Sequence, residues 1–303
     1  MNVSKKTLFS LWSLSLFMMI LLVSCTPTAE PKPTVTVASK NFTEQFIVAE
    51  MYALMLEEAG FEVVRRLNLG ETPVAHQALL DGEIDLYPEY TGTGLLTILK
   101  EPVQTDRQAV FDTVSQAYQT DFDLVWLEAA PMNNTQALAM TQSRAAELGI
   151  TTISDMIAQA DELMMAGPPE FQEREDGLLG LQRVYGVFEL AQYVPIDPGL
   201  RYSALVNGDV DVVVAFGTDG QISAFDLVLL EDDRNLWPPY QIAPVVRASL
   251  VDSNPELAET LNKLAPLMTD EVMQSLNNQV SGDGREPAEV AADFLRENGL
   301  IDG

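Results

Sequence analysis

The sequence of 303 residues contains a single cysteine and a single histidine. Because Cys25 has no second cysteine to pair with, an intramolecular disulfide is excluded. A catalytic Cys–His pair and a His/Cys metal cluster are unavailable for the same reason, and no G-x-x-x-x-G-K-[ST] phosphate loop is present. We therefore expect no enzyme activity, no cofactor and no metal. His76, on a predicted helix among apolar residues, is interpreted as a packing or surface residue.

Basic residues are also scarce, at 17 against 45 acidic ones, and the formal net charge is −28. This balance excludes nucleic acid and anionic membrane surfaces as partners, because both are bound through patches of lysine and arginine. An acidic surface suits either a saline environment or ordinary solubility, and the sequence leaves both explanations open. Without disulfides, stability must come from the apolar core, and a chain of this length can build one or two.

The N-terminal segment has the pattern of a secretory signal, in which two lysines precede an apolar run over residues 8–23. The ending Leu21-Leu22-Val23-Ser24-Cys25 resembles the bacterial lipobox, whose cysteine becomes the lipidated first residue. We therefore expect a lipoprotein signal peptide over residues 1–24, a tether over 25–33, and an extracytoplasmic protein anchored to the cell membrane through lipid on Cys25. A plain transmembrane anchor is the alternative, because the apolar run is near the lower limit for spanning roughly 30 Å of hydrocarbon.

The rest of the chain alternates predicted strands and helices. Strands are predicted over residues 34–39, 61–67, 84–87, 124–127, 137–141, 163–166, 210–216, 227–230 and 243–246. Helices are predicted over residues 43–59, 72–81, 94–100 and 106–120, and the tail from 255 to 300 is mostly helical. Such alternation predicts an α/β fold with parallel sheets covered by helices.

An internal repeat lies within this pattern at an offset of 126 residues. The segment Ala78–Leu86 resembles Ala204–Val212, and Tyr90–Gly94 lines up with Phe216–Gly220. Each copy predicts a helix, a glycine turn, a strand and then a loop that leads into the N-terminus of another helix. The free N–H groups of such a loop can bind an anionic group of a ligand. The repeat indicates two similar lobes with a cleft between them. The alternative is that it reflects only the general pattern of α/β proteins.

Several segments together carry a family resemblance. They are Ser39–Gln45, Tyr87–Thr93, Pro169–Gly177, Ala215–Gly220 and Glu231–Tyr240. In this order they resemble the extracytoplasmic solute-binding proteins of ABC importers for quaternary-amine osmoprotectants such as glycine betaine, choline and carnitine.

The resemblance covers residues 34–300 and implies a two-lobed, type II-like periplasmic-binding-protein fold with the ligand cleft between the lobes. Lobe one would comprise residues 34–137 and 244–303, and lobe two residues 138–243. The implied partners are ABC permease subunits, the membrane through the lipid anchor, and a small zwitterionic or quaternary-amine ligand.

The same resemblance implies an aromatic cage. A trimethylammonium group has no N–H donor, so it is held by cation–π attraction and dispersion against aromatic faces. The cage tyrosines of the family fall at Tyr90, Tyr202 and Tyr240, whereas Gln136 occupies the position of a fourth. An amide supplies hydrogen bonds but no full aromatic face, so one wall of the cage is changed. The alternative for each tyrosine is a purely structural role at a strand end or loop.

Further residues are implied as contacts for a ligand carboxylate. Arg174 resembles the family's carboxylate-binding arginine, whose planar fork suits that task, and Lys40 could add a second positive contact. Their alternatives are a surface ion pair with a neighbouring glutamate and a solvated loop lysine. The remaining candidates are Thr72, Thr91, Thr218 and Gln45, although threonines also serve as helix N-caps.

The leading hypothesis is therefore capture of a quaternary-amine osmoprotectant for import. The same transport role for a different zwitterionic amino-acid derivative is an alternative, because Gln136 replaces a cage tyrosine. A lipoprotein enzyme on a similar frame is a third.

Overall fold

A computed structural model of the chain describes residues 32–174, 176–197 and 200–302. The predicted signal peptide, Cys25 and most of the tether lie outside the described residues. Within the described ranges, no helix is both long enough and apolar enough to cross a membrane.

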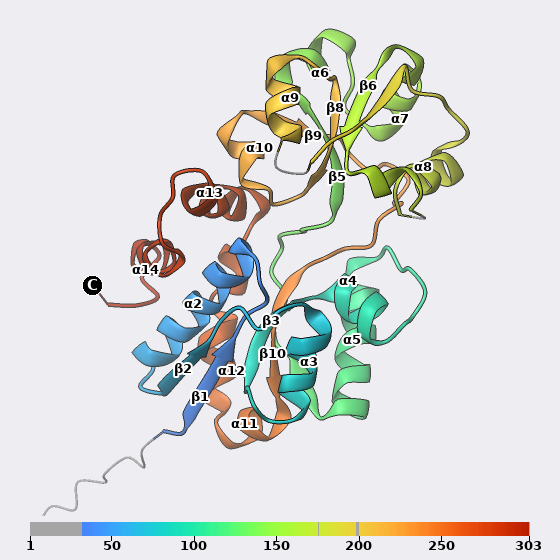
Figure 1. The fold of residues 1–303 in the computed structure, drawn as a ribbon. Coiled ribbons are helices and arrows are strands. Elements are labelled where there is room, and N and C mark those ends of the chain that lie inside the picture. The colour runs from blue at the N-terminus through green and yellow to red at the C-terminus, as the bar shows by residue number, and fades with distance from the viewer. Residues whose placement is uncertain (1–31, 175, 198–199, 303) are drawn as a thin grey trace, which may run out of the picture. The chain divides into compact units, whose positions relative to one another are not determined.

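The strands of the described residues form two five-stranded sheets (Figure 1). The first has the order β2-β1-β3-β10-β4 and the second has the order β7-β6-β8-β5-β9. The strands are β1 (Thr34–Ala38), β2 (Glu62–Arg66), β3 (Leu86–Tyr90), β4 (Leu124–Trp126), β5 (Gln136–Thr141), β6 (Met164–Gly167), β7 (Gln192–Pro195), β8 (Val212–Phe216), β9 (Leu227–Leu229) and β10 (Ile242–Arg247). The two sheets have the same sequence of parallel and antiparallel neighbours, with β10 in the first corresponding to β5 in the second.

Both sheets are mixed, so the prediction of parallel sheets is wrong for two strands. β10 runs antiparallel to β3 and β4, and β5 runs antiparallel to β8 and β9. A parallel neighbour on the same sheet requires a crossover, usually through a helix. β5 and β10 each enter their sheet through a loop that comes from the other sheet, so that requirement does not apply to them. The alternation of strands and helices therefore does not predict the strand direction where the chain passes from one sheet to the other.

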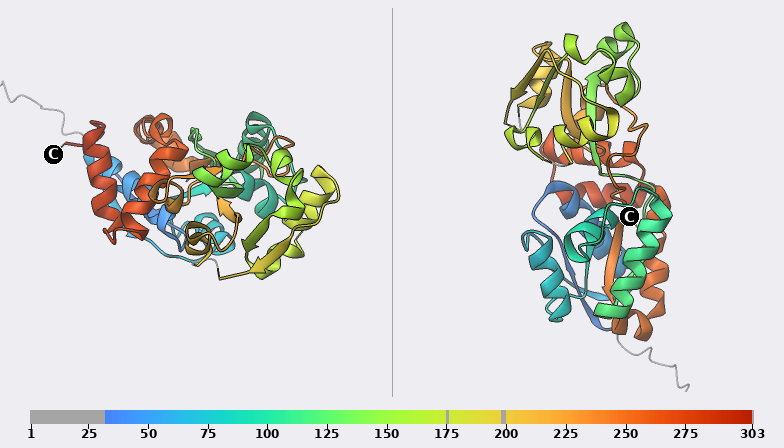
Figure 2. Two further views of the ribbon diagram at one scale, coloured as in Figure 1. Left: turned by 90° about the horizontal axis from the view of Figure 1, so that it is seen from above. Right: turned by 90° about the vertical axis from the view of Figure 1, so that its right-hand side faces the viewer.

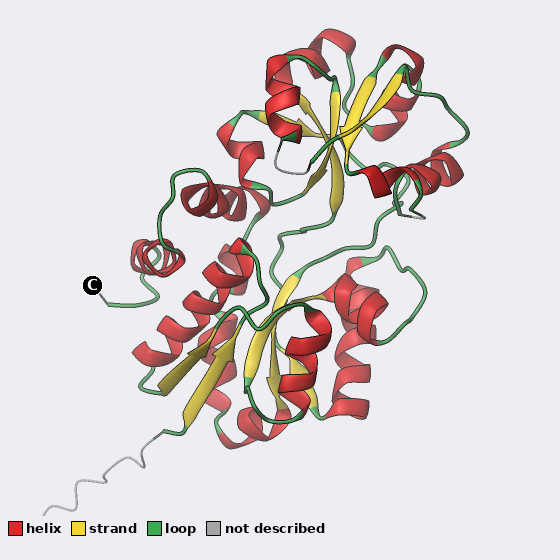
Figure 3. Cartoon of the chain, in the orientation of Figure 1, coloured by secondary structure: helices red, strands yellow, loops and turns green. Residues whose placement is uncertain are grey.

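Helices lie against both sheets (Figures 2 and 3). They are α2 (Thr43–Glu58), α3 (Thr72–Leu80), α4 (Thr91–Thr93), α5 (Arg107–Phe122), α6 (Gln142–Leu148), α7 (Ile153–Ile157), α8 (Leu178–Tyr185), α9 (Arg201–Asn207), α10 (Gly220–Ala224), α11 (Ala248–Ser253), α12 (Pro255–Asn262), α13 (Asp270–Ser281) and α14 (Pro287–Glu297). A short π-helix, η1 (Gly94–Ile98), and three 3₁₀-helices, η2 (Ala160–Glu162), η3 (Pro169–Gln172) and η4 (Ala265–Leu267), complete the described elements. The predicted strands and helices agree with this order, but β7 lies outside every predicted strand, and α6, α7, α8 and α11 lie outside every predicted helix.

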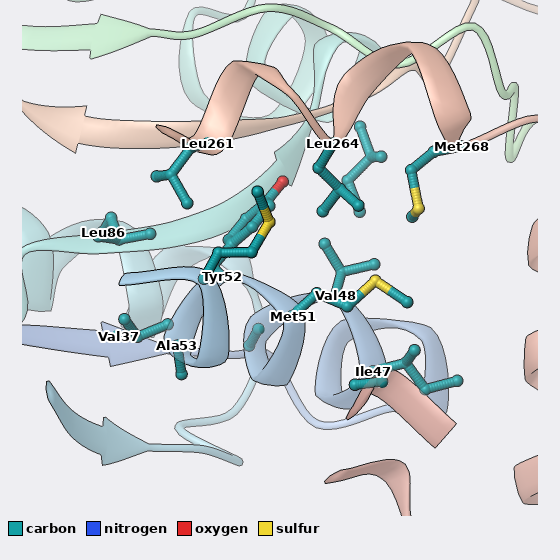
Figure 4. Close-up of a cluster of buried hydrophobic side chains, with 14 of the residues drawn as sticks. Val37, Ile47, Val48, Met51, Tyr52, Ala53, Leu86, Leu261, Leu264 and Met268 are labelled. Carbon is teal, nitrogen blue, oxygen red and sulfur yellow. The ribbon is translucent and has the colours of Figure 1, made fainter. Parts of the chain in front are cut away.

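The core of the first sheet is built around α2, which is apolar on nearly all sides. Figure 4 shows Met51 and Tyr52 of this helix packed between the strands and the side chains of Leu261, Leu264 and Met268. The C-terminal segment therefore completes the core that the N-terminal segment begins. The division into lobes at residues 138 and 243 stays a prediction, and both positions lie inside strands, β5 and β10.

The internal repeat corresponds to a repeated structure. In the first copy α3 ends at a turn through Gly82, with φ +71°, and leads into β3; in the second, α9 ends at a turn through Gly208, with φ +78°, and leads into β8. This positive φ is unfavourable for residues with a Cβ atom, which explains glycine at both turns.

Each copy also contains an aspartate that fastens the strand start to the neighbouring strand. The Asp85 carboxylate accepts the backbone N–H of Thr36 at 2.8 Å, and the Asp211 carboxylate accepts that of Met164 at 2.9 Å. Arginines near the C-terminal ends of β10 and β5 pair with these aspartates: Arg247, the last residue of β10, with Asp85 at 3.3 Å, and Arg144, in α6 just after β5, with Asp211 at 2.9 Å.

Candidate functional site

The first candidate site is a cavity of about 490 Å³, here called the main cavity. Its aromatic lining consists of Phe42, Tyr90, Phe216 and Tyr240, and its polar lining includes Lys40, Thr72, Asn134 and Asp219. These residues come from elements of both sheets and from the segments that connect them.

Tyr90 ends β3 and forms a fixed wall of the main cavity. Its side chain is only 4% exposed, its hydroxyl donates to Oε1 of Glu44 at 2.7 Å, and its ring stacks on Phe42 with centroids 6.2 Å apart. Burial and the neighbouring Glu44 charge raise the pKa of Tyr90 well above its ordinary value, so the phenol stays protonated.

Lys40 and Thr72 meet at the same wall in a buried charge network. The Lys40 ammonium lies 2.5 Å from Oε1 of Glu89, donates to the Thr72 hydroxyl at 3.2 Å, and sits 4.7 Å from the centre of the Tyr90 ring. The Thr72 hydroxyl in turn donates to Glu89 at 3.2 Å. The positive charge predicted for a ligand carboxylate is therefore neutralised within the protein by Glu89.

Phe216 is a cavity residue that the predicted cage does not contain. It is 41% exposed, lines the main cavity, and pairs with Gln136 across the β8–β5 ladder. The internal repeat carries the signal that could have identified it, because Phe216 aligns with Tyr90. Tyr240, as predicted for the cage, lines the same cavity, and burial raises its pKa to about 12.

A second cavity of about 230 Å³, here called the Gln136 cavity, shares Asn134, Phe216 and Tyr240 with the main cavity. Its own lining includes the predicted site residues Gln136 and Arg174 together with Asp176.

Three polar side chains of the Gln136 cavity, those of Gln136, Arg174 and Asp176, are bonded to each other. The Gln136 amide donates to Oδ2 of Asp176 at 2.7 Å, and Arg174 forks the same carboxylate through Nε at 2.7 Å and Nη2 at 2.5 Å. The hydrogen bonds from Arg174 hold the pKa of Asp176 below its usual value. Arg174 thus binds a carboxylate, but that carboxylate belongs to the protein.

The other predicted site residues do not line either of these cavities. Tyr202 is 4% exposed and donates to Asp219 at 2.5 Å. Thr91 is fully buried and joins the end of β3 to the entry of β10, through the carbonyl of Pro239 and the N–H of Gln241.

Two further predicted residues lie beside the cavities. Gln45 accepts the backbone N–H of Lys40 at 3.2 Å. Thr218 is 1% exposed and, together with Glu44, lines a third cavity of about 250 Å³ that shares Asn134 with the main cavity.

His76 is buried and packs edge-to-face on Tyr118 and Phe122, with ring centroids 5.4 and 5.0 Å away. Burial lowers its pKa, which favours the neutral form. These contacts agree with its interpretation as a packing residue.

The chain has two similar mixed sheets covered by helices, and elements of both sheets supply residues to an aromatic-lined cavity. This arrangement is typical of periplasmic binding proteins. The model of one family, the substrate binding domain of ABC-type glycine betaine transport systems, matches residues 33–297. The chain belongs to this family of extracytoplasmic binding components of ABC transporters, which are not enzymes.

Individual relatives agree with this assignment. The chain is 36% identical over 279 residues to a glycine-betaine-binding protein of Pseudomonas aeruginosa, with 89% of each chain covered. It is 35% identical over 294 residues to the ergothioneine transport permease/ergothioneine binding protein EgtU of Helicobacter pylori; the match covers 95% of this chain but 52% of that relative, so the chain spans about half its length.

Among solved structures, one described as a glycine betaine/carnitine/choline ABC transporter superimposes with a TM-score of 0.86 at 30% identity, covering 89% of this chain and all of that one. The predicted fold class is thereby confirmed.

Proposed function

We propose that the chain captures a zwitterionic quaternary amine in the main cavity and delivers it to the permease of an ABC importer. The observation that carries this proposal is the aromatic lining, in which Phe216 and Tyr240, beside the buried ring of Tyr90, line the space for a cation that has no hydrogen to donate. Phe216 would serve as the cage residue that the family resemblance assigned to Tyr202. The hydroxyl of Tyr202 instead donates a hydrogen bond to Asp219, a residue of the cavity lining.

The ligand carboxylate would be bound by replacing a carboxylate of the protein that now pairs with a basic side chain. Lys40 and Arg174 both pair with carboxylates of the protein, Glu89 and Asp176. A planar arginine fork recognises any carboxylate bidentately, and the half-exposed Arg174–Asp176 pair opens at a smaller desolvation cost than the buried Lys40–Glu89 pair. We therefore assign the first carboxylate contact to Arg174, with Lys40 and Thr72 as the fixed part of the site.

The second candidate is a zwitterionic amino-acid derivative with an additional polar group. It is favoured by the Gln136 cavity, where an amide and Asp176 form a polar wall in place of an aromatic face. The Helicobacter relative is described as binding ergothioneine, which belongs to this class. The rest of the transport role would be unchanged, with residues 34–137 and 244–303 closing against 138–243 and lipid on Cys25 holding the chain at the outer face of the membrane.

Calorimetric titration of residues 26–303 with glycine betaine, choline, carnitine, proline betaine and ergothioneine tests both candidates. One-to-one binding of any of the first four compounds supports the quaternary-amine site. Because ergothioneine also carries a trimethylammonium group, it supports the second candidate only if it binds and the first four do not. A folded, ligand-free protein that binds none of the five would overturn both.

A further inference from the structure

Glu44, in the first turn of α2, is a buried carboxylate that neither candidate ligand role uses. It is 3% exposed, and the hydrogen-bond partners that the described residues provide for it are neutral groups. Tyr90 donates to Oε1 at 2.7 Å, Asn134 donates to Oε1 at 3.0 Å, and Asn277 donates to Oε2 at 2.8 Å. A buried carboxylate without a cation is costly, so this arrangement calls for an explanation.

The partners of Glu44 come from separate parts of the chain. Tyr90 ends β3 of the first sheet, and Asn134 lies in the segment that leads from β4 to β5 in the second sheet. Asn277 belongs to α13, and its same amide nitrogen also donates to the backbone carbonyl of Thr218, in the loop after β8, at 2.8 Å. The Thr218 hydroxyl is itself a hydrogen-bond partner of Glu44. One carboxylate therefore joins a wall of the main cavity to a loop of the second sheet.

The charge of Glu44 fixes which way these side chains point. An ionised carboxylate only accepts hydrogen bonds, so both asparagines must turn their NH₂ groups toward it. Two of the side chains held in this way, Tyr90 and Asn134, line the main cavity. In Glu44→Gln, the NH₂ group of the glutamine would face an N–H or O–H group that also donates, and two donors cannot bond to each other. The simplest way to remove this conflict is rotation of the Asn277 amide. That rotation removes the N–H that Asn277 donates to Thr218.

We propose that Glu44 is a positioning residue of the ligand site: its carboxylate holds Tyr90 and Asn134 in the binding geometry and couples them to the 217–220 loop. The inference deepens the proposed function, on which its affinity readout rests. Glu44 lines the cavity of about 250 Å³ that also contains Thr218, but it is absent from the lining of the main and the Gln136 cavities, so the proposal does not make it a ligand contact.

The test compares Glu44→Gln with Glu50→Gln. Glu50 lies on the same helix, is 7% exposed, and pairs with Arg65 at 2.7 Å away from the cavities, so it controls for loss of a buried charge on α2. For Glu44→Gln we expect about tenfold weaker binding of the ligand that the wild type binds, the size expected for losing charged hydrogen bonds. The ligand-free melting temperature should fall no further than that of Glu50→Gln.

Equal affinity in Glu44→Gln and wild type would overturn the proposal. So would a weaker affinity accompanied by a melting temperature well below that of Glu50→Gln, since this would indicate a merely structural role.

Amide hydrogen exchange of the ligand-free proteins separates this proposal from the proposed function. In Glu44→Gln, exchange at residues 216–220 should become faster than in wild type and in Glu50→Gln, whether or not any compound binds. Unchanged exchange there overturns the coupling, even if the ligand is confirmed. If the wild type binds none of the tested compounds, the proposed function fails, and the exchange result still decides the role of Glu44.

Discussion

Residues 78–94 and 204–220 have the same scaffold but end in different chemistry. Both run from a helix through a glycine turn into a central strand, and both fasten the strand start with an aspartate, Asp85 or Asp211. At the strand ends the copies diverge, because Glu89 and Tyr90 in the first correspond to Ala215 and Phe216 in the second. The shared part determines the sheet, and the divergent part determines what each strand presents to the main cavity.

The divergence gives the two strand ends different properties. In the first copy a fully buried carboxylate and ammonium stand behind a tyrosine that is 4% exposed. In the second copy Ala215 stands in place of Glu89, the nearby charges are the Arg201–Asp219 pair at 2.6 Å, and Phe216 is 41% exposed. We interpret the first end as a rigid wall with a buried ion pair directly behind it, and the second as a more exposed aromatic surface available to a ligand.

The largest expected effect comes from erasing this difference in charge. Glu89→Ala makes the first copy resemble the second and leaves the Lys40 ammonium buried without its carboxylate. We expect a loss of about 3–5 kcal/mol in the free energy of unfolding, the typical cost of breaking a buried pair, measured by urea denaturation. The double variant Lys40→Met/Glu89→Ala should recover much of it. A single variant as stable as wild type would contradict the rigid-wall interpretation.

The shared aspartates should respond equally. Asp85→Asn and Asp211→Asn each weaken a charged hydrogen bond to a strand N–H and an arginine pair, so each should lower the free energy of unfolding by about 2 kcal/mol. Because the side chains are 18% and 20% exposed, solvent screening should be similar at both sites. Urea denaturation of the two variants in parallel tests the equivalence. If one variant lost stability clearly and the other did not, the two copies would share their geometry but not the contribution of the aspartate to stability.

A smaller effect is expected on ligand affinity from the second copy. Phe216→Ala should weaken binding about tenfold, since one cation–π face is removed, with little change in stability because the ring is partly exposed. Phe216→Tyr, which restores the residue type of the first copy, should bind like wild type. Calorimetric titration of both variants measures this. If the alanine variant retains full affinity, Phe216 is not a cage face.

The scaffold was predictable from sequence because it depends on local patterns. The apolar run within residues 43–59, which Gly60 ends, and the repeated glycine turns are local signals, and the structure has these elements nearly at the predicted bounds. The antiparallel strands β5 and β10 were not predictable in this way. Their direction depends on where the chain crosses between sheets, and no local pattern records that.

The site was predictable only in part, for the same reason. Tyr90, Tyr240 and Lys40 belong to segments whose order resembles the family, and they line one cavity together with Thr72. Glu44 gave no signal as a buried carboxylate, because its Asn277 partner is 233 residues away along the chain. Burial created by such a distant contact cannot be deduced from the first turn of a helix.

The smallest effect concerns Glu44, which meets both copies through Tyr90 and Thr218. Burial raises its pKa above the ordinary 4.5, so the folded state binds a proton more readily than the unfolded state. Its contribution to stability is then fully present below pH 4.5 and is lost as the pH rises through the folded pKa, with a slope of at most about 1.4 kcal/mol per pH unit for one proton. We expect the free energy of unfolding of wild type, relative to Glu44→Gln, to decrease with rising pH above 4.5. The large acidic background is common to both proteins and cancels in this difference. If the difference in the free energy of unfolding did not depend on pH, the hydrogen bonds to Glu44 would fully compensate the cost of burying its charge. Glu44 would then connect the two copies without lowering the stability of the fold.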